Sequence, residues 1–523
     1  MAVRRSLFFS LSQRYLTMVI SLLSTVILAR LLTPEEMGIF FVCAAIMMVV
    51  QTVAQFGVLH YIVQERRLTP ARFRASVGVI VASSLVAFAA LWAARWPIAD
   101  FYGEPALANV MSVYAMSLLV IPLNTPAVAW LQREMRFDAV FVIGLTGAVV
   151  QAVTSVALAI AGYNYMALAW AAIAEQVGIT AATLAYRSRE TWAIPSIIGW
   201  RKVVRVGASM SAAQLLQEMG NLAPQLAIGR FQGFGGAGLF NRGLTAVNLF
   251  HRSFVQAIVP VLLPAFSRTH REGGNVPEAL MQTVSYVAVI AWPFFAVTAI
   301  MAFPIVRLLF GDQWDAAVPV VQILALTALC LPVNSISGEV LVALGRSGSF
   351  FRIQSAVQVV RIVSAILLAA VSIEAVAGAM VGATVIQLVL VLATLKAAVG
   401  LNPGQLVLRM RSSGIVTVLA ASGPLALMLL DPVAVLGVIP TIMIGGALAA
   451  MGWVLGIFVG QHQVVDEVRL VLCQARQRIS ARRRTAPVGR GEDERAEERL
   501  RVSRAAVPDR PVPPAAAPIS RSA

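Results

Sequence analysis

Residues 28–40 read LARLLTPEEMGIF and lie between two apolar runs, where the chain has to make its first hairpin turn. The same pattern returns 200 residues later, so that Arg30 matches Arg230 and Gly38 matches Gly238. Both copies read as an apolar helix, an arginine, a short loop, a glycine and a second apolar helix. Self-similarity at such a distance predicts two copies of one structural unit.

The composition predicts an all-α polytopic membrane protein. Hydrophobic residues make up 59% of the 523 residues, and charged residues only 13%, whereas a soluble domain carries about 25% charged residues. The apolar residues come in runs of about 20, long enough to cross a hydrocarbon core of about 30 Å. We expect about fourteen transmembrane helices, at residues 9–30, 37–60, 75–95, 107–130, 138–161, 164–186, 203–229, 236–263, 279–302, 317–343, 350–371, 374–398, 412–431 and 433–459.

The distribution of positive charge predicts the orientation in the membrane. Lysines and arginines gather in alternate loops, including Arg66, Arg67, Arg72, Arg74, Arg133, Arg136, Arg187, Arg189, Arg268, Arg271, Arg346, Arg352, Lys396, Arg409 and Arg411. The positive-inside rule places these loops in the cytoplasm. We therefore expect a multi-pass protein of the inner (cytoplasmic) membrane with both termini inside, and we attribute the net charge of +16 to topology rather than to a nucleic-acid partner.

The repeat extends beyond the opening stretch. Residues 121–124 (IPLN) match residues 331–334 (LPVN) at an offset of 210. Each half contains an even number of predicted helices, so the halves are parallel repeats about an axis along the membrane normal. The predicted organisation is an N-terminal lobe at 1–187, a cytoplasmic amphipathic linker at 188–202, a C-terminal lobe at 203–398, two extra helices at 399–460, and a cytoplasmic, mostly disordered basic tail at 461–523.

Polar side chains recur at helical spacing on one face of several predicted helices. In hydrocarbon an unpaired polar group is costly, so such a face has to point at other helices or at water. The alternative to a hydrated space is a set of interhelical hydrogen bonds that hold a bundle together. Because the stripes occur in both halves, we expect a central cavity lined by Arg14, Gln51, Gln55, Gln151, Gln214, Gln217, Asn221, Asn241, Arg242, Asn248, Arg252 and Arg361.

Charged residues within the predicted helices have competing explanations. Arg14 and Arg252 lie near predicted cytoplasmic ends, where a long side chain can reach the interface, whereas Arg361 lies about half way along its helix. Glu175 and Glu218 are the deepest carboxylates. They are candidates either for pairing with these arginines or for ion coupling.

The sequence shows no pattern for a cofactor or for catalysis. The three cysteines and four histidines lack the spacing of a metal site or a disulfide. The glycines near residue 235 form a turn between apolar helices, a poor context for nucleotide binding. We expect no metal, no cofactor and no enzymatic activity.

Four segments, at residues 28–40, 133–138, 238–242 and 343–346, resemble in order the oligosaccharide flippases of bacterial polysaccharide biosynthesis. That family belongs to the multidrug/oligosaccharidyl-lipid/polysaccharide exporter superfamily, and the resemblance covers about residues 1–460. It implies two six-helix lobes that face a central cavity, and a substrate of sugars on a polyprenyl diphosphate. It does not supply a fixed set of functional residues, so the candidates above come from the polar stripes.

The leading hypothesis is a flippase that moves a polyprenyl-diphosphate-linked oligosaccharide by alternating access of two lobes, for extracellular polysaccharide biosynthesis. Arginine presents a planar fork of donors to phosphate oxygens, and amides suit sugars. Expected partners are the lipid-linked glycan, membrane lipids, and polysaccharide polymerase or export proteins.

Three alternatives stay open. A cation-coupled drug exporter of the same superfamily usually needs a carboxylate in its first half, and the first helix has none at depth. A membrane enzyme that polymerises glycans would need larger outer loops. A non-transporting scaffold would not need polar stripes in both halves.

Overall fold

The computed structural model describes residues 2–186, 191, 194–196, 198–250, 256–430 and 432–463. Throughout these residues the secondary structure is helical, and no strand occurs among them. One compact unit, Met1–His462, contains every helix named below, and a second unit comprises Gln463–Ala523. The tail predicted to be disordered lies almost wholly outside the described residues, as do Arg187 and, in the predicted linker, Arg189.

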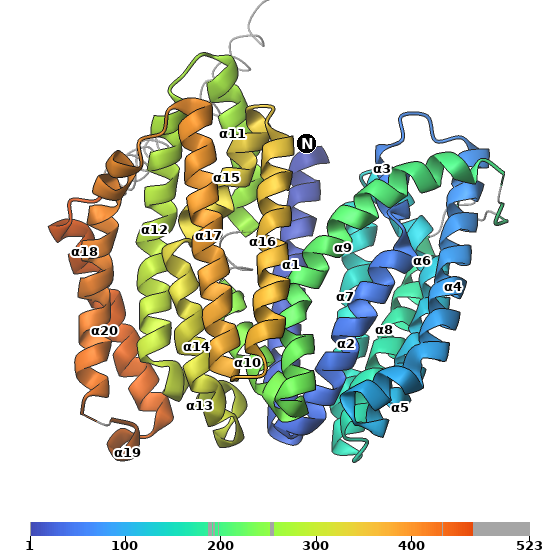
Figure 1. Cartoon of the computed structure of the whole chain (residues 1–523), viewed down its shortest axis with the longest axis horizontal. Coiled ribbons are helices and arrows are strands. Elements are labelled where there is room, and N and C mark those ends of the chain that lie inside the picture. Colours follow the sequence, from blue (N-terminus) through green and yellow to red (C-terminus); the bar gives the residue numbers. More distant parts are fainter. Residues whose placement is uncertain are drawn as a thin grey trace, which may run out of the picture. The chain divides into compact units, whose positions relative to one another are not determined.

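The first half of the chain forms eight helices (Figure 1). They are α1 (Ala2–Leu31), α2 (Pro34–Gln55), α3 (Val58–Gln64), α4 (Pro70–Tyr102), α5 (Pro105–Ala115), α6 (Ser117–Arg133), α7 (Phe137–Ile160) and α8 (Tyr165–Tyr186).

The second half and its extension follow in the same unit. They comprise α9 (Trp200–Phe231), α10 (Gly233–Phe250), α11 (Gln256–Arg271), α12 (Val276–Ile300), α13 (Ala302–Phe310), η3 (Asp312–Ala317), α14 (Val318–Ala325), η4 (Leu326–Leu329), α15 (Leu331–Ala343), α16 (Ser347–Leu368), α17 (Ile373–Val399), α18 (Pro403–Met428), α19 (Pro432–Leu436) and α20 (Val438–Val459).

The opening stretch folds as a sharp turn between α1 and α2. Thr33 caps α2: its side chain accepts a hydrogen bond from the backbone N–H of Glu36 at 3.3 Å, and the Glu36 carboxylate accepts one from the backbone N–H of Thr33 at 2.8 Å. This capping box satisfies donors that the first turn of a helix leaves free, and Pro34 suits the first helical position because it has no N–H to satisfy. The turn predicted from sequence therefore has a local cause.

Fewer than fourteen helices of the described residues are individually long and apolar enough to span a membrane. Within the described residues, eleven helices are long and apolar enough to span, or twelve if the pair Asp312–Leu329 and Leu331–Ala343, bent by 48°, is one span. The predicted spans 203–229 and 236–263 fall on α9 and on α10 with α11. These elements are helical, but the polar stripe of α9 lowers its hydropathy, and residues 251–255 between α10 and α11 lie outside the described part. The count of fourteen remains a prediction.

The two halves use equivalent asparagines in the same way. Asn124 on α6 donates to Gln176 Oε1 at 3.2 Å and to Thr180 Oγ1 at 3.1 Å, both on α8. Asn334, which matches Asn124 at the offset of 210, lies on α15 and donates to the carbonyl oxygen of Thr384 on α17 at 3.1 Å. Each asparagine thus joins the fourth predicted span of its half to the sixth, as expected for two copies of one unit.

The helix α9 connects elements of both halves. Near its start, Gly207 lies so close to the turn between α2 and α3 that a Cβ there would overlap the carbonyl oxygen of Phe56, and Lys202 Nζ lies 2.7 Å from Oε2 of Glu65, the residue after α3. At its end, Gln232 donates to the carbonyl oxygen of Ala369, after α16, at 3.0 Å. Figure 1 shows α9 slanting from the side of α3 towards α10 and α16.

The ion pair at the start of α9 perturbs an acid outside the predicted spans. The hydrogen bond from Lys202, followed by the charges of Lys202 and Arg72, holds the pKa of the Glu65 carboxyl below its ordinary value. Arg72 Nη1 lies 3.1 Å from Glu65 Oε1. Glu65 therefore stays ionised at neutral pH and fastens α9 to the first half.

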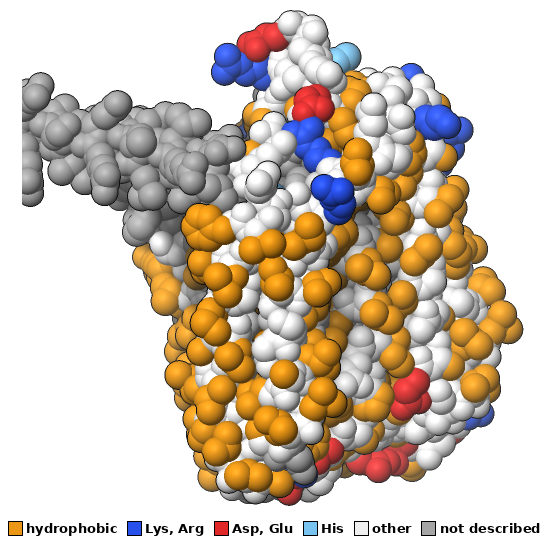
Figure 2. All heavy atoms as spheres, turned by 90° about the vertical axis from the view of Figure 1, so that its left-hand side faces the viewer, with side chains coloured by type: hydrophobic (Ala, Val, Ile, Leu, Met, Phe, Trp, Pro, Cys, Tyr) orange, Lys and Arg blue, Asp and Glu red, His pale blue; other side chains and the backbone are white. Residues whose placement is uncertain are grey.

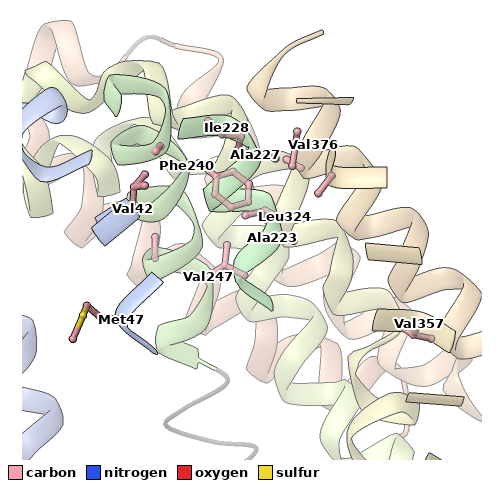
Figure 3. Close-up of a cluster of buried hydrophobic side chains, with 14 of the residues drawn as sticks. Val42, Met47, Ala223, Ala227, Ile228, Phe240, Val247, Leu324, Val357 and Val376 are labelled. Atoms are coloured by element: carbon pink, nitrogen blue, oxygen red, sulfur yellow. The ribbon is translucent and has the colours of Figure 1, made fainter. Parts of the chain in front are cut away.

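A buried apolar cluster lies where α2 meets helices of the second half (Figure 3). Val42 and Met47 from α2, Ile228 from α9 and Phe240 from α10 are fully buried within it. Leu324 of α14 and other neighbours complete the packing. The largest continuous core of the described residues therefore includes the contact between the halves.

The outer faces of α18 and α20 are apolar (Figure 2). Val418, Met443 and Phe458 are 68%, 69% and 62% exposed, respectively. In the view of Figure 2, blue arginine and lysine side chains gather near the upper end, above a broad orange band. Apolar exposure on this scale, on helices whose backbone groups are satisfied internally, is what lipid requires. The chain is a multi-pass membrane protein.

Candidate functional site

A polar cluster lies between α9 and α16, and it contains two of the residues selected from sequence. Arg361 Nη1 donates to Asn221 Oδ1 at 3.2 Å. Arg361 Nε is buried without a hydrogen-bond partner in the described part of the chain. A guanidinium that uses only part of its fork retains donors for an anion.

Gln358 joins this cluster, although sequence reasoning did not select it. It lies three residues before Arg361 on α16 and is 5% exposed. It packs so closely over Gly220 of α9 that a Cβ on this glycine would overlap Gln358 Oε1. That oxygen is buried and has no partner among the described residues. Its spacing from Arg361 was the signal that could have identified it.

Several polar residues of α9 are accessible. Gln214, Gln217 and Asn221 are exposed, and Glu218 is half-buried. They lie on a helix that contacts α2 and α4 of the first half and α16 of the second. An exposed row of amides on such a helix is the feature expected of a surface that borders water.

Asn241 is held by a chain of hydrogen bonds from α10 to α2. Its side chain donates to Gln225 Oε1 at 2.9 Å, and Gln225 Nε2 donates to the carbonyl oxygen of Phe41. Gln225 is 6% exposed. Asn241 and Asn248 are both half-buried on α10. The orientation of Asn241 is therefore set by contacts between the halves.

Arg242 lies in an aromatic box rather than in the cluster. It is 3% exposed, and its Cζ lies 5.1 Å from the ring centroid of Phe41, 5.4 Å from that of Phe310 and 5.3 Å from that of Trp314. Its Nη2 contacts Met37 Sδ at 2.9 Å. A cation over aromatic faces gains electrostatic stabilisation that increases with desolvation. Arg242 therefore joins α10 to α2, α13 and η3.

The other candidates lie elsewhere. Gln51, Gln55 and Gln151 are half-buried on α2 and α7, and none of them is hydrogen-bonded to Arg361 or Asn221. Arg14 is half-buried on α1. Arg252 lies outside the described residues.

The two deep carboxylates are half-buried on α8 and α9. Neither Glu175 nor Glu218 takes part in an ion pair in the ranges that the structure describes. Pairing with the candidate arginines, one of the two alternatives drawn from sequence, is therefore not seen there.

A separate apolar groove of about 790 Å³ opens along α18. Gly414 contributes to its wall, and a Cβ on this glycine would meet nothing within 4 Å. Arg411 is the only charged residue of the lining. The lining residues are Trp292, Leu329, Val333, Leu388, Leu392, Leu406, Val407, Met410, Arg411, Gly414, Ile415, Val418, Leu419 and Val459.

Comparison with known proteins identifies similar sequences. A family described as "Polysaccharide biosynthesis protein" matches residues 27–319, more than half of the chain. The lipopolysaccharide biosynthesis protein WzxC of Escherichia coli K12 is 22% identical over 339 residues, covering 64% of this chain and 68% of WzxC. The succinoglycan biosynthesis transport protein ExoT of Rhizobium meliloti is 25% identical over 308 residues, covering 58% of this chain and 61% of ExoT. The match to ExoT thus spans less than two thirds of that protein.

Two solved structures share the fold. The lipid II flippase MurJ in an inward closed conformation superimposes with a TM-score of 0.68 at 12% identity, covering 86% of this chain and 99% of MurJ. An inward-facing multidrug resistance transporter of the MATE family gives a TM-score of 0.57 at 15% identity, covering 76% of this chain and 95% of that chain. The helical membrane fold is therefore one that a flippase and a drug exporter have in common.

Proposed function

Because the chain belongs to the polysaccharide biosynthesis protein family, we propose that it is a flippase for a polyprenyl-diphosphate-linked oligosaccharide. It moves this lipid across the cytoplasmic membrane, and the glycan is then used for extracellular polysaccharide biosynthesis. The names of WzxC and ExoT, and the fold shared with MurJ, support this assignment.

The observation that carries the proposal is the cluster of Arg361, Asn221 and Gln358. A diphosphate needs donors, and the half-buried Arg361 has an Nε without a protein partner in the described region. The side-chain oxygen of Gln358 has no partner among the described residues either, and a movement of α16 away from α9 would let it accept from a sugar hydroxyl. A lipid-linked oligosaccharide offers both groups next to each other.

The remaining candidates are assigned to the path of the head group. Gln214, Gln217, Asn241 and Asn248 contact sugars, together with Gln51, Gln55 and Gln151. Arg14 and Arg252 attract the diphosphate near the predicted cytoplasmic entrance. Arg242 stabilises the packing of the helices that border the path. Glu175 and Glu218 are the candidates for ion coupling.

The apolar groove along α18 accommodates the polyprenyl chain. Its wall is almost wholly hydrocarbon, and Arg411 contributes the one charge. If the lipid chain stays in the groove while the head group crosses, the chain does not enter water and the head group does not enter hydrocarbon.

The function is tested by reconstituting the protein in vesicles with a lipid-diphosphate oligosaccharide. Exposure of the glycan to an impermeant lectin is expected to rise well above that in protein-free vesicles, since the lipid does not cross unaided. If the protein leaves the glycan distribution unchanged but moves soluble drugs in exchange for cations, the exporter function replaces the flippase.

The predicted orientation has a separate test. Single cysteines at Arg72 and Arg411 should react only with reagents that reach the cytoplasm. Cysteines at Glu104 and Gln313 should react with impermeant reagents added outside. The physical reason is the excess of arginine and lysine in the first set of loops. Labelling of any of these four positions from the other side contradicts the topology.

A further inference from the structure

The described part of the linker before α9 is held against the start of α4. The backbone N–H of Ser196 donates to the carbonyl oxygen of Arg74 at 3.1 Å, and Arg74 Nε donates to the carbonyl oxygen of Ile194 at 3.2 Å. A Cβ on Gly78 of α4 would overlap the carbonyl oxygen of Ser196, so the linker can lie this close only because residue 78 is a glycine. The position of the linker backbone is therefore set by α4.

Three large apolar side chains of this segment are nevertheless left uncovered by the protein. Ile194 is 75% exposed, Ile198 is 81% exposed, and Trp200, the first residue of α9, is 46% exposed. Exposed apolar side chains that gather on one part of a fixed backbone mark a surface for a membrane or for another protein.

Positively charged side chains lie beside these apolar residues. Arg74 is in the first turns of α4, Arg201 and Arg205 are one turn apart at the start of α9, and all three are exposed. None of the ion pairs of the described residues involves them. Glu65, the acid that contacts the start of α9, is already paired with Lys202. The three arginines can therefore receive an anion from outside the protein.

The location of these residues favours lipid over a soluble partner. Arg74 directly precedes the span predicted at 75–95, and Arg201 lies just before the span predicted at 203–229. Figure 1 shows the green ribbon of α9 beginning at the right-hand margin of the first half, beside the upper end of α4, which it contacts. Tryptophan is typical of the border between a membrane and water, and arginines at that border attract anionic headgroups.

We propose that this linker surface binds anionic phospholipids of the predicted cytoplasmic leaflet; it consists of Ile194, Ile198, Trp200, Arg74, Arg201 and Arg205. The headgroup phosphates accept hydrogen bonds from the guanidinium groups, and the apolar side chains enter the boundary between headgroups and acyl chains. A zwitterionic lipid offers the same apolar boundary but no net negative charge. The bound lipid holds the start of α9 at the membrane surface, whatever substrate the protein moves.

A fluorophore on Ile198→Cys tests the linker surface in the full chain, with the native cysteines Cys43, Cys330 and Cys473 replaced by alanine. The bilayer contains equal parts of phosphatidylcholine and phosphatidylglycerol, and the acyl chains of either one lipid or the other carry bromine, which quenches only nearby fluorophores. Brominated phosphatidylglycerol is expected to quench about twofold more than brominated phosphatidylcholine, because each arginine adds attraction for anionic lipid. Salt at about 1 M should largely abolish the difference, since it screens charges beyond about 3 Å.

The charge variant is Arg201→Gln with Arg205→Gln, in which the two brominated lipids should quench almost equally. Its matched control, Arg271→Gln with Arg346→Gln, removes the same charge from two exposed arginines of the second half and should keep the preference. A fluorophore on Val86→Cys, at an exposed position within α4, reports contact with lipid in general, and both lipids should quench it equally.

Three outcomes overturn the proposal. One is equal quenching at Ile198 by the two lipids when the arginines are intact. Another is quenching at Ile198 by neither lipid while Val86 is quenched, because then protein or water covers the linker surface. The third is an equal loss of preference in the charge variant and in its matched control. No arm of the experiment measures translocation, so the result does not depend on the proposed function.

Discussion

Arg361→Ala is expected to lower translocation of a lipid-diphosphate oligosaccharide by about tenfold or more, because a hydrogen bond to a charged group is worth about 1.5–3 kcal/mol. Arg361→Lys should recover part of the rate, since lysine keeps the charge but loses the planar fork. The measurement is the initial rate of glycan exposure in vesicles that contain equal amounts of folded protein.

The control for Arg361 lies on the same helix. Arg352 is exposed near the start of α16, and Arg352→Ala should translocate normally. Asn221→Ala should weaken transport less in the Arg361→Ala background than alone, because residues in contact are not additive. An unchanged rate for Arg361→Ala at normal protein amount removes this residue from the site. Arg252→Ala, assayed in the same way, tests the arginine that the structure does not describe.

Gly414→Phe is expected to impair transport through the lipid chain rather than through the head group. The open space around Gly414 lets the ring enter the groove without disturbing the helix. A prenyl chain that moves from lipid into the groove gains packing contacts but little hydrophobic free energy. We therefore expect the phenylalanine ring to act by excluding the chain sterically from the groove. Translocation of a long-chain substrate should therefore fall several-fold, and that of a short-chain analogue should fall much less.

Gly446→Phe supplies the comparison on α20, at an exposed glycine that also has open space around it and does not line the groove. It should translocate both substrates at the rate of the unmodified protein. Equal loss with long and short chains in Gly414→Phe would show that the groove does not hold the lipid.

Local patterns in the sequence predicted the main features of the fold. Hydropathy identified most of the spanning helices, and the offset of Gly38 and Gly238 identified the two related halves. The polar spacing on α9 selected Asn221, the offset of 210 from Gln151 selected Arg361, and the structure joins the two by a hydrogen bond.

Contacts between distant segments escaped sequence analysis. Arg242 was selected for a water-filled path, yet Phe310 and Trp314, which enclose it, come from elements that no local pattern connects with α10. Gln358 was missed because its spacing from Arg361 went unused, and its contact with Gly220 of α9 joins segments that no local pattern connects. The count of fourteen stays a prediction, because the polar face of α9 lowers its hydropathy and the predicted span 236–263 includes residues that the structure does not describe.

The slant of α9 has a consequence for the way the protein can move. By sequence α9 is the first helix of the second copy, but its first turns contact residues at both ends of α3 through Lys202 and Gly207. The division of the chain into duplicated units therefore does not coincide with its division into mechanical bodies. If the first-half and second-half helices rock relative to each other, α9 moves with neither group alone, because it is attached to both. Either it flexes near Pro224, the proline inside this helix, or the anchor at Lys202 is released in each transport cycle.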